Sequence, residues 1–327
     1  MTGTSPTTEK AYRVATEGPL ESHRFAGLDA GPELLVLGAV HGNEVCGPRA
    51  IERAIAQCRS GELLIRRGAV TFVPVANPKA YLQRSREGDR NLNRSLAEKP
   101  VPADYEDRIG NRLCDLLRRH EVLLDIHSFR SAGEPFTFFG PEDGAMPHRP
   151  FRHAAAEGAL AAALGTRVAI HGWLENYERL LAIRNGLGFP PGSIAEGYGT
   201  TEYIRFQGGY GVTLECGTHD DPAAIEVGHR AIVNTFAHLG LTDDPPPERP
   251  EQTVIHIVDI VVCEAAGDRL EGSWRTGDPV AAGTVLARRA GGEAVLAPSD
   301  GFIIFPHPGA KPGEGICHFG VKSGRVI

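Results

Sequence analysis

The sequence contains no apolar run of about 18 residues, so it predicts no transmembrane helix. Its first ten residues are polar and rich in threonine, and they lack the apolar core of a secretory signal. The six cysteines are widely scattered and form no C-x-x-C pair. Basic residues are outnumbered, with 34 Lys and Arg against 41 Asp and Glu, which argues against a nucleic-acid binder. These absences predict a cytoplasmic protein with reduced thiols and with neither a membrane nor a nucleic-acid partner.

The overall amino-acid composition is typical of a soluble globular protein. Hydrophobic residues make up 41% of the chain and charged residues 23%. A chain of 327 residues is long enough for one large domain or for two. The sequence leaves the oligomeric state open, with a homo-oligomer among the alternatives.

A histidine and a glutamate lie three residues apart within residues 38–44, GAVHGNE. The mainly apolar residues 33–37 precede them and follow a Gly-Pro pair, which predicts a short buried strand. We therefore expect His41 and Glu44 on the loop beyond the carboxyl end of that strand, where open α/β sheets place their sites. Imidazole and carboxylate are both good zinc ligands, and a tight turn can direct the two at one ion.

A second strand-like run supplies the third protein ligand that a catalytic zinc site usually needs. Residues 121–124 are short and mainly apolar, and His127 follows them in the sequence DIHS. An H-x-x-E pair alone is weak evidence, because a chain with 13 histidines contains one by chance fairly often. Two histidines that each follow a buried strand favour a metal site over ordinary polar loop residues. We expect one Zn²⁺ per chain, bound by His41, Glu44 and His127.

Strand-like and helix-like segments alternate over the first 240 residues, which predicts an α/β sandwich with a mainly parallel or mixed sheet. The strand-like segments are residues 33–37, 69–75, 121–124, 136–139 and 211–216. The helix-like segments are residues 47–60, 104–117, 153–164 and 222–239.

This alternation ends at residues 243–250, where four prolines occur within eight residues. So many prolines fit neither a helix interior nor a central strand, which predicts a domain boundary. Beyond it, glycines separate short β runs, a texture typical of a small β-barrel or sandwich. We expect a catalytic α/β domain over residues 1–244 and a C-terminal β domain over residues 251–327.

Residues 77–94 contain four arginines, Arg84, Arg86, Arg90 and Arg94. Such clusters are usually solvated surface patches, but this one is concentrated in an acidic protein and is too short for nucleic acid. A guanidinium grips a carboxylate through two parallel hydrogen bonds, and a neighbouring amide can donate a third. We expect Arg94 and Asn93 to hold a substrate carboxylate, and another arginine to polarise a scissile carbonyl.

Glu215 ends an otherwise apolar strand-like run, where a carboxylate is costly to bury unless it is paired or catalytic. A carboxylate near a water molecule activated by zinc can accept the water's proton. The alternative role is a structural salt bridge to one of the arginines. We expect Glu215 to be a catalytic base.

Together these motifs resemble the succinylglutamate desuccinylase/aspartoacylase branch of the zinc carboxypeptidase superfamily. The matching pieces occur in family order and cover roughly residues 30–220. They are residues 38–44, Asn77-Pro78, NLNR at 91–94, DIHS at 125–128 and TLECG at 213–217. The glycine-punctuated β segment at the end also looks like the C-terminal domain of this branch.

The resemblance implies the same three zinc ligands and names Glu215 as the general base. It implies that Arg86 stabilises the carbonyl oxygen, and that Asn93 and Arg94 hold the substrate carboxylate. The chain departs from the family at Asn91, where an aspartate is frequent. It also has no tyrosine after position 210, although family members use one from the C-terminal domain to contact the substrate. We therefore expect neither N-acyl aspartate nor N-acyl glutamate in particular.

The sequence thus predicts a zinc-dependent amidohydrolase that removes an acyl group from a small N-acyl amino acid or a related amide with a carboxylate. The nearest alternative is a metallocarboxypeptidase acting on short peptides, which would use the same residues in an open cleft. A catalytically silent metal- or metabolite-binding protein is a rival of another class. The presence of all three ligands together with Glu215 argues against it.

Overall fold

The computed structural model describes residues 18–144 and 151–327. Residues 1–10, in which the sequence shows no pattern of a secretory signal, lie outside these ranges. Within them, no helix is both long and apolar enough to cross a membrane. All six cysteines are free thiols, and all except Cys58 are buried.

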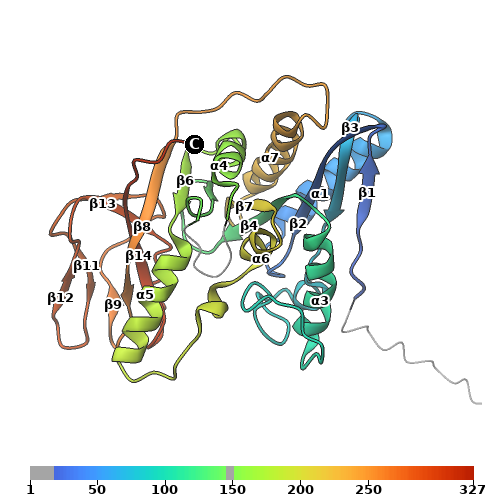
Figure 1. Ribbon diagram of the computed structural model, residues 1–327. Helices are drawn as coiled ribbons and strands as arrows, with labels where there is room; N and C mark the ends of the chain where they lie inside the picture. The colour runs from blue at the N-terminus through green and yellow to red at the C-terminus, as the bar shows by residue number, and fades with distance from the viewer. Residues whose placement is uncertain (1–17, 145–150) are drawn as a thin grey trace, which may run out of the picture.

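An eleven-stranded mixed sheet runs through the molecule (Figure 1). In spatial order its strands are β1 (His23–Ala26), β3 (Arg67–Val73), β2 (Asp29–Gly38), β4 (Val122–Phe129), β7 (Tyr210–Thr218), β5 (Phe136–Phe138), β6 (Val168–His171), β8 (Thr253–Val262), β14 (Gly315–Lys322), β13 (Gly301–Ile304) and β10 (Pro279–Val280). Strands β3, β2, β4 and β7 are parallel to one another. Strand β5 is antiparallel to β7, and β6 is parallel to both β5 and β8.

Helices cover both faces of the first part of the sheet (Figure 1). One face is covered by α1 (Cys46–Ser60), α4 (Ala154–Ala163) and α7 (Ala223–Leu239). The other is covered by α3 (Tyr105–Arg118) and α6 (Thr200–Phe206). The remaining helices are the short α2 (Pro78–Gln83), α5 (Trp173–Gly186), which packs on β8, and the 3₁₀ helix η1 (Ile194–Gly197).

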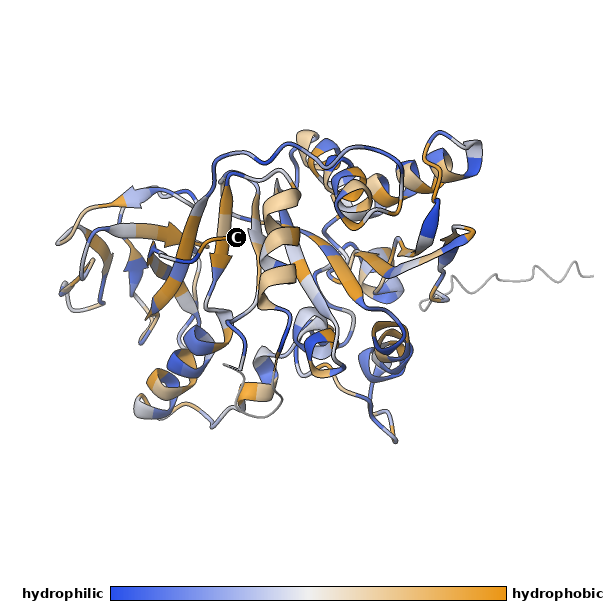
Figure 2. Cartoon of the chain, turned by 45° about the horizontal axis from the view of Figure 1, so that its top comes forward, coloured by the Kyte–Doolittle hydropathy of each residue, from blue (hydrophilic) through white to orange (hydrophobic). Residues whose placement is uncertain are grey.

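Alternate side chains of the central strands point to the two helical layers. Leu34 and Val36 of β2 belong to the core under α1, α4 and α7, whereas Leu35 and Leu37 belong to the core under α3 and α6. Because both faces are covered, these strands are apolar throughout instead of alternating with polar residues. In Figure 2 the apolar colour appears on strands of the sheet, and the helices that cover them mix apolar and polar colours.

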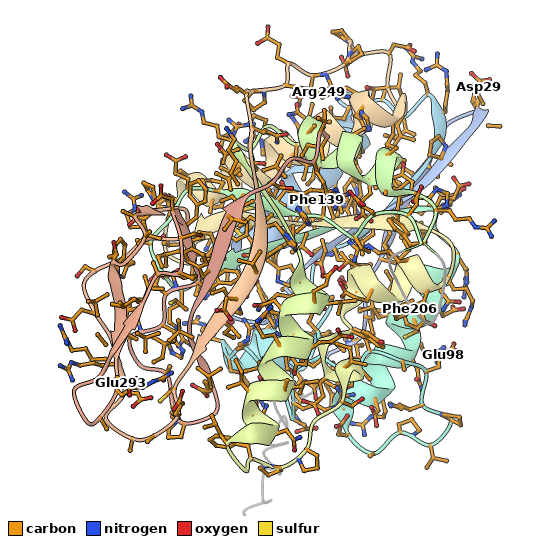
Figure 3. The ribbon with its side chains drawn as sticks, turned by 60° about the vertical axis from the view of Figure 1, so that its left-hand side comes forward. Asp29, Glu98, Phe139, Phe206, Arg249 and Glu293 are labelled. Carbon is orange, nitrogen blue, oxygen red and sulfur yellow. The ribbon has the colours of Figure 1, made fainter. Side chains whose placement is uncertain are left out.

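Beyond residue 242 the chain forms no helix or strand until β8 begins at Thr253. Because β8 pairs with β6, the C-terminal strands extend the main sheet. A second sheet has the order β12 (Ala294–Leu296), β11 (Val285–Arg288), β9 (Arg269–Leu270). Figure 3 shows Arg249 on the connection at one end of the molecule and Glu293 at the outer end of these strands. The division into residues 1–244 and 251–327 stays a prediction.

The expected fold class, an α/β sandwich with a mixed sheet, is confirmed. The C-terminal part consists mainly of short strands, most of them separated by glycine-containing turns, as expected. The sequence did not predict helices α2, α5 and α6 or strands β1, β6, β9 and β14.

A buried ion cluster joins three of these elements. The Arg205 guanidinium of α6 donates to Glu157 of α4 at 2.9 Å and to Glu202 at 3.0 Å. It also donates to the carbonyl of Gly211 at the start of β7 at 3.0 Å, and the Gly211 N–H donates to Glu157 at the same distance. These side chains are almost inaccessible to solvent, at 4% for Arg205 and 1% for Glu157. Both carboxylates therefore depend on Arg205 for compensation of their charge.

We predict that Arg205→Met lowers the free energy of unfolding by about 3–5 kcal/mol, because it leaves two buried carboxylates without a cation. Arg53→Met is the matched control, since Arg53 pairs with Glu226 at the surface, where both side chains are about half exposed. Its effect should stay below about 1 kcal/mol. Urea unfolding of both variants measures the difference, and similar losses in the two would contradict the role of the cluster.

Candidate metal centre and active site

The loop after β2 directs two side chains into one site. The backbone N–H of Glu44 donates to the carbonyl of His41 at 3.1 Å, which closes a tight turn. Gly42 lies against α2 so closely that a Cβ atom there would stand 2.0 Å from the backbone carbon of Ala80. The glycine between histidine and asparagine is therefore required for the turn to pack against α2, and His41 and Glu44 lie beyond the strand end, as expected.

His127 comes from the neighbouring strand β4 and completes the cluster. Its Nδ1 lies 2.9 Å from one oxygen of Glu44, and the Nδ1 of His41 lies 2.9 Å from the other. The ligand atoms of the three residues all lie within 4.8 Å of one another, and all three side chains are buried. His127 lies within β4 and not beyond its end as the sequence suggested, so this ligand is part of the buried sheet.

The second nitrogen of each histidine faces an oxygen acceptor. The Nε2 of His41 lies 3.1 Å from Oδ1 of Asn91, and the Nε2 of His127 lies 2.9 Å from Oδ2 of Asp125. Outer partners of this kind orient the imidazole rings of metal ligands, so that here the two Nδ1 atoms point towards Glu44. Two histidine nitrogens and one carboxylate are the ligand set of many catalytic zinc sites, so the residues present fit this ion.

The electrostatics of the cluster also suit a cation. Burial opposes ionisation of Glu44, but the two histidines hold the pKa of this carboxyl well below its usual value. Burial likewise opposes protonation of His127, yet the carboxylates of Asp125 and Glu44 raise the pKa of this imidazole well above its usual value. The site therefore contains a buried excess of negative charge that a proton or a metal ion can balance.

Glu215 lies beside this cluster on the next strand. It is the register partner of His127 in the parallel β4–β7 pair, and both side chains point to the α3–α6 face. Its Oε2 is buried without a hydrogen-bond partner, and burial raises the pKa of this carboxyl to about 8. In the described part of the chain it forms no ion pair with an arginine, so a structural salt bridge is not its role.

Of the four arginines in the loop, two line the pocket. Arg86 donates to Glu44 at 3.2 Å, and Arg94 lies over the ring of Trp173 at 5.3 Å. Arg90 instead pairs with Asp104 and Asp107 at the start of α3, and Arg84 is exposed at the end of α2. The anion-binding part of the loop is therefore smaller than the sequence suggested.

Glu106 of α3 shapes this loop, and no pattern in the sequence had indicated it. Its buried carboxylate accepts hydrogen bonds from the backbone N–H groups of Gly88 and Asp89, both at 2.9 Å, and from Arg90 at 3.3 Å. The loop thus wraps around one buried anion, and this arrangement fixes the positions of Arg86 on one side and Asn93 on the other.

Asn93 and Arg94 lie together beside α6, as expected. The Oδ1 of Asn93 accepts from the backbone N–H of Thr200 at 2.9 Å, which leaves its Nδ2 as a donor. Among residues 18–144 and 151–327, no Asp or Glu forms an ion pair with Arg94. Burial, together with the charge of Arg86, lowers the pKa of this guanidinium. A cation in this setting favours an anionic partner from outside the chain.

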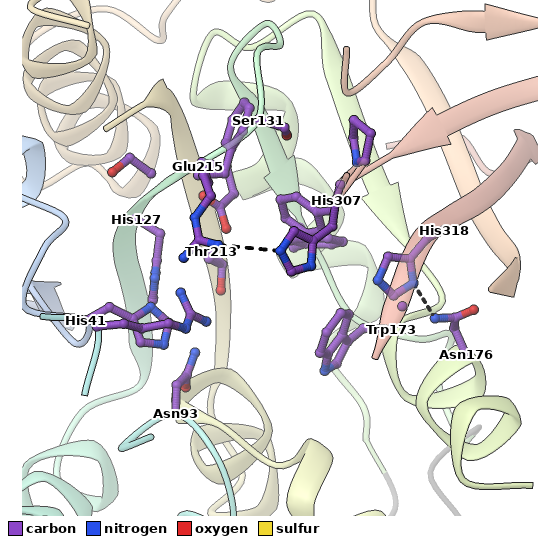
Figure 4. A pocket seen from close by; sticks show the side chains of 18 of the residues that line it. His41, Asn93, His127, Ser131, Trp173, Asn176, Thr213, Glu215, His307 and His318 are labelled. Atoms are coloured by element: carbon purple, nitrogen blue, oxygen red, sulfur yellow. Dashed lines mark hydrogen bonds between the residues drawn. The ribbon is translucent and has the colours of Figure 1, made fainter. Parts of the chain in front are cut away.

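These residues line one cavity of about 880 Å³. The metal-ligand cluster, Glu215, Arg86 and Arg94 form part of its wall, and residues from α5 and the C-terminal strands form the rest. Figure 4 shows His41 and His127 on one side, Glu215 between, and Trp173 and His318 on the opposite side. The C-terminal part thus closes over the site that the first part builds.

Comparison with known proteins adds the family. Residues 30–172 match the sequence model of the succinylglutamate desuccinylase/aspartoacylase catalytic domain. The part of the chain that supplies the metal-ligand cluster is therefore similar to this catalytic domain. No curated protein sequence matches it.

Solved structures share the fold over nearly the whole chain. The succinylglutamate desuccinylase/aspartoacylase from Rhodobacter sphaeroides has a TM-score of 0.72 and 18% identity, covering 93% of this chain and 90% of its own. The product-bound ectoine utilization protein EutE (DoeB) from Ruegeria pomeroyi has a TM-score of 0.70 and 24% identity, with 92% and 88% covered. The succinylglutamate desuccinylase from Silicibacter sp. TM1040 has a TM-score of 0.70 and 20% identity, with 93% and 89% covered.

We predict that the purified protein binds about one zinc ion per chain and that His127→Ala loses it, because two of three ligands hold the ion poorly. His229→Ala is the matched control, since this buried histidine of α7 contacts Gln57 and lies outside the metal-ligand cluster. Metal analysis after dialysis, with circular dichroism to confirm folding, measures the effect. Full zinc retention in a folded His127→Ala variant would refute the assignment.

Proposed function

We propose that the protein is a zinc-dependent amidohydrolase that removes an acyl group from an N-acyl amino acid or a related small amide with a carboxylate. One observation supports this most directly. The carboxyl of Glu215 shares the pocket with the His41–Glu44–His127 cluster and with Arg94, and neither Glu215 nor Arg94 has an ion-pair partner among the residues that the structure describes. A buried carboxyl, a possible set of metal ligands and a guanidinium that could bind an anion share one cavity, and this combination supports hydrolysis of such a substrate.

His41, Glu44 and His127 would hold the metal through two imidazole nitrogens and one carboxylate. When bound, zinc would polarise the scissile carbonyl and make water more acidic. Asn91 and Asp125 would keep the two imidazoles oriented through their Nε2 atoms. Mutating outer partners of this kind typically weakens metal binding by about 10–100-fold.

Glu215 would transfer the proton. It accepts a proton from the attacking water as the new carbon–oxygen bond forms, and it donates that proton to the amine nitrogen as the carbon–nitrogen bond breaks. The products are a carboxylic acid and a free amine. A carboxyl whose pKa is raised towards neutrality by burial can both accept and return a proton efficiently.

Arg86 and Arg94 would have different roles, one in stabilising the transition state and the other in binding the substrate. Arg86 lies next to the cluster and would stabilise negative charge on the carbonyl oxygen in the transition state. Arg94 and the Nδ2 of Asn93 would hold the carboxylate of the substrate, and this contact fixes which bond meets the reactive groups. The pocket walls contributed by the C-terminal strands narrow the site, which favours a small amide over a peptide chain.

The names of the structural relatives agree with this reaction class, since two of the three are called desuccinylases. We further propose that the partner of the protein is this small-molecule substrate. The reaction would take place in the cytoplasm, where six free cysteines remain reduced.

We predict that Glu215→Gln lowers kcat by a factor of about 10² or more, because the amide keeps the shape of the side chain but cannot accept the proton. The zinc content should stay that of the wild type, because Glu215 is not a ligand. Steady-state kinetics and metal analysis of the same sample separate the two effects. A variant with unchanged kcat would remove Glu215 from the mechanism.

We predict that an N-acyl amino acid with a free carboxylate is cleaved at least about tenfold better than its amide, since the amide leaves Arg94 without a charged partner. Arg94→Ala should raise KM for the acid more than it lowers kcat, because the carboxylate is held in both ground and transition states. It should also remove the preference for the acid. Equal rates for acid and amide in the wild type would contradict this role.

A further inference from the structure

Four aromatic side chains form a closed ring on the pocket wall opposite the metal-ligand cluster. Trp173 lies 6.0 Å from Phe138, Phe138 lies 5.8 Å from Phe305, Phe305 lies 6.3 Å from His318, and His318 lies 6.0 Å from Trp173, measured between ring centroids. All four line the cavity and remain half-buried. They are here called the aromatic ring site. None of them takes part in the reaction described above.

These side chains come from distant parts of the chain and are held individually. Phe138 ends β5, Trp173 begins α5, Phe305 follows β13 and His318 belongs to β14. The indole N–H of Trp173 donates to the carbonyl of Gly197 at 3.3 Å, and Asn176 contacts the Nδ1 of His318 at 2.7 Å. The two surfaces of the pocket, from α5 and from the C-terminal strands, therefore meet in this ring.

The backbone at Phe305 is in the left-handed region, with φ of +49°. A bulky residue rarely adopts this conformation, and such strain is concentrated at ligand-contacting positions. The backbone N–H of Phe305 donates to the hydroxyl of Thr276 at 3.0 Å, which helps to hold it there. In this conformation the Phe305 ring contacts both Phe138 and His318 and so links two members of the aromatic ring site.

The charge around the ring site decides what it can accept. The Arg94 guanidinium lies 5.3 Å from the Trp173 ring, so a cation at the ring site would be repelled. Burial and the same guanidinium lower the pKa of His318 to about 4, so this imidazole is neutral and adds no positive charge for an acidic group. Once Arg94 is paired with the substrate carboxylate, a second carboxylate among the ring faces would lose its hydration without gaining a partner. An uncharged group is favoured.

We propose that the aromatic ring site receives the side chain of the amino acid that the reaction releases, and that this side chain is aromatic. The inference rests on the proposed function. The α-carboxylate of that amino acid would bind Arg94. The side chain of the amino acid is attached to the same α-carbon as this carboxylate, so it would reach the adjoining Trp173. Aromatic pairs prefer edge-to-face or offset contacts with centroids about 4.5–7 Å apart, which a flat ring bound here can make.

One arginine could oppose this preference. Arg130 also lines the pocket, and it contacts His307 at 3.5 Å while remaining exposed to solvent. An acidic substrate side chain could turn away from the ring site and reach this pair. A preference for N-acyl aspartate would therefore show that Arg130, and not the aromatic ring site, selects the substrate.

The first test compares substrates that share one acyl group, chosen as the best of acetyl, propionyl and succinyl. We expect kcat/KM for N-acyl phenylalanine to exceed that for N-acyl alanine, N-acyl aspartate and N-acyl lysine at least tenfold. Even one methylene in an apolar pocket changes this ratio about tenfold or more. A higher value for the aspartate or lysine derivative would overturn the aromatic assignment and leave the deacylase intact.

Two variants locate the preference. Trp173→Ala should reduce the phenylalanine-to-alanine ratio of kcat/KM at least fivefold, but it also removes a neighbour of Arg94. Phe138→Leu is the second variant, because Phe138 contacts the Trp173 ring and leucine keeps an apolar side chain at this position. It should lower the same ratio while the rate for N-acyl alanine changes less than about threefold. An unchanged ratio in both variants would overturn the proposal.

A binding measurement separates this proposal from the proposed function. The chain has two tryptophans, Trp173 and Trp274, and both line the pocket. In Trp274→Phe, the fluorescence of Trp173 should change on titration with N-acetyl-phenylalanine. N-acetyl-aspartate should bind about tenfold more weakly, so the same fluorescence change should need a higher concentration of it. Binding without hydrolysis of any acyl amino acid would refute the deacylase and retain the aromatic ring site. Hydrolysis with no preference in binding would do the reverse.

Discussion

A single buried carboxylate, that of Glu44, constrains the geometry of the whole site. Only 1% of this residue is exposed, and its two oxygens face both histidines, Arg86 and the backbone N–H of Ser128. A buried anion is costly unless such partners surround it, so each must arrive at a fixed distance. The parallel register of β2 with β4, which pairs Gly38 with Ile126, sets the two histidine-bearing segments side by side.

The same principle recurs one layer further out. Glu106 accepts hydrogen bonds from the backbone of the arginine loop. Asp125 contacts His127 and accepts a hydrogen bond from Thr200 of α6. These carboxylates act on backbone and imidazole groups, and the result is that the groups facing the pocket are positioned before any ligand binds. Preorganisation of this kind is what lets electrostatic stabilisation act without rearrangement during the reaction.

Much of the first half of the molecule could be predicted from the sequence, because its strands are covered on both faces and are apolar throughout. His41 and Glu215 interrupt or end such runs and are therefore conspicuous. Helix α5 could not be predicted, since it begins after a left-handed glycine without a side-chain cap, and it buries only Asn176 and Tyr177. The neighbours of Arg94 on the far wall come from positions 79 or more residues away (173 − 94 = 79), and no local pattern connects them.

The continuity of the large sheet determines how the cavity can exchange its contents. Four consecutive residue pairs join β6 to β8, so the two walls belong to one hydrogen-bonded ladder and cannot swing apart as separate bodies. Residues 130–132 and 306–308 line the cavity and lie outside the named strands, so they can move without breaking this ladder. The rate at which product leaves would then follow the fluctuations of these few residues and not a hinge between halves.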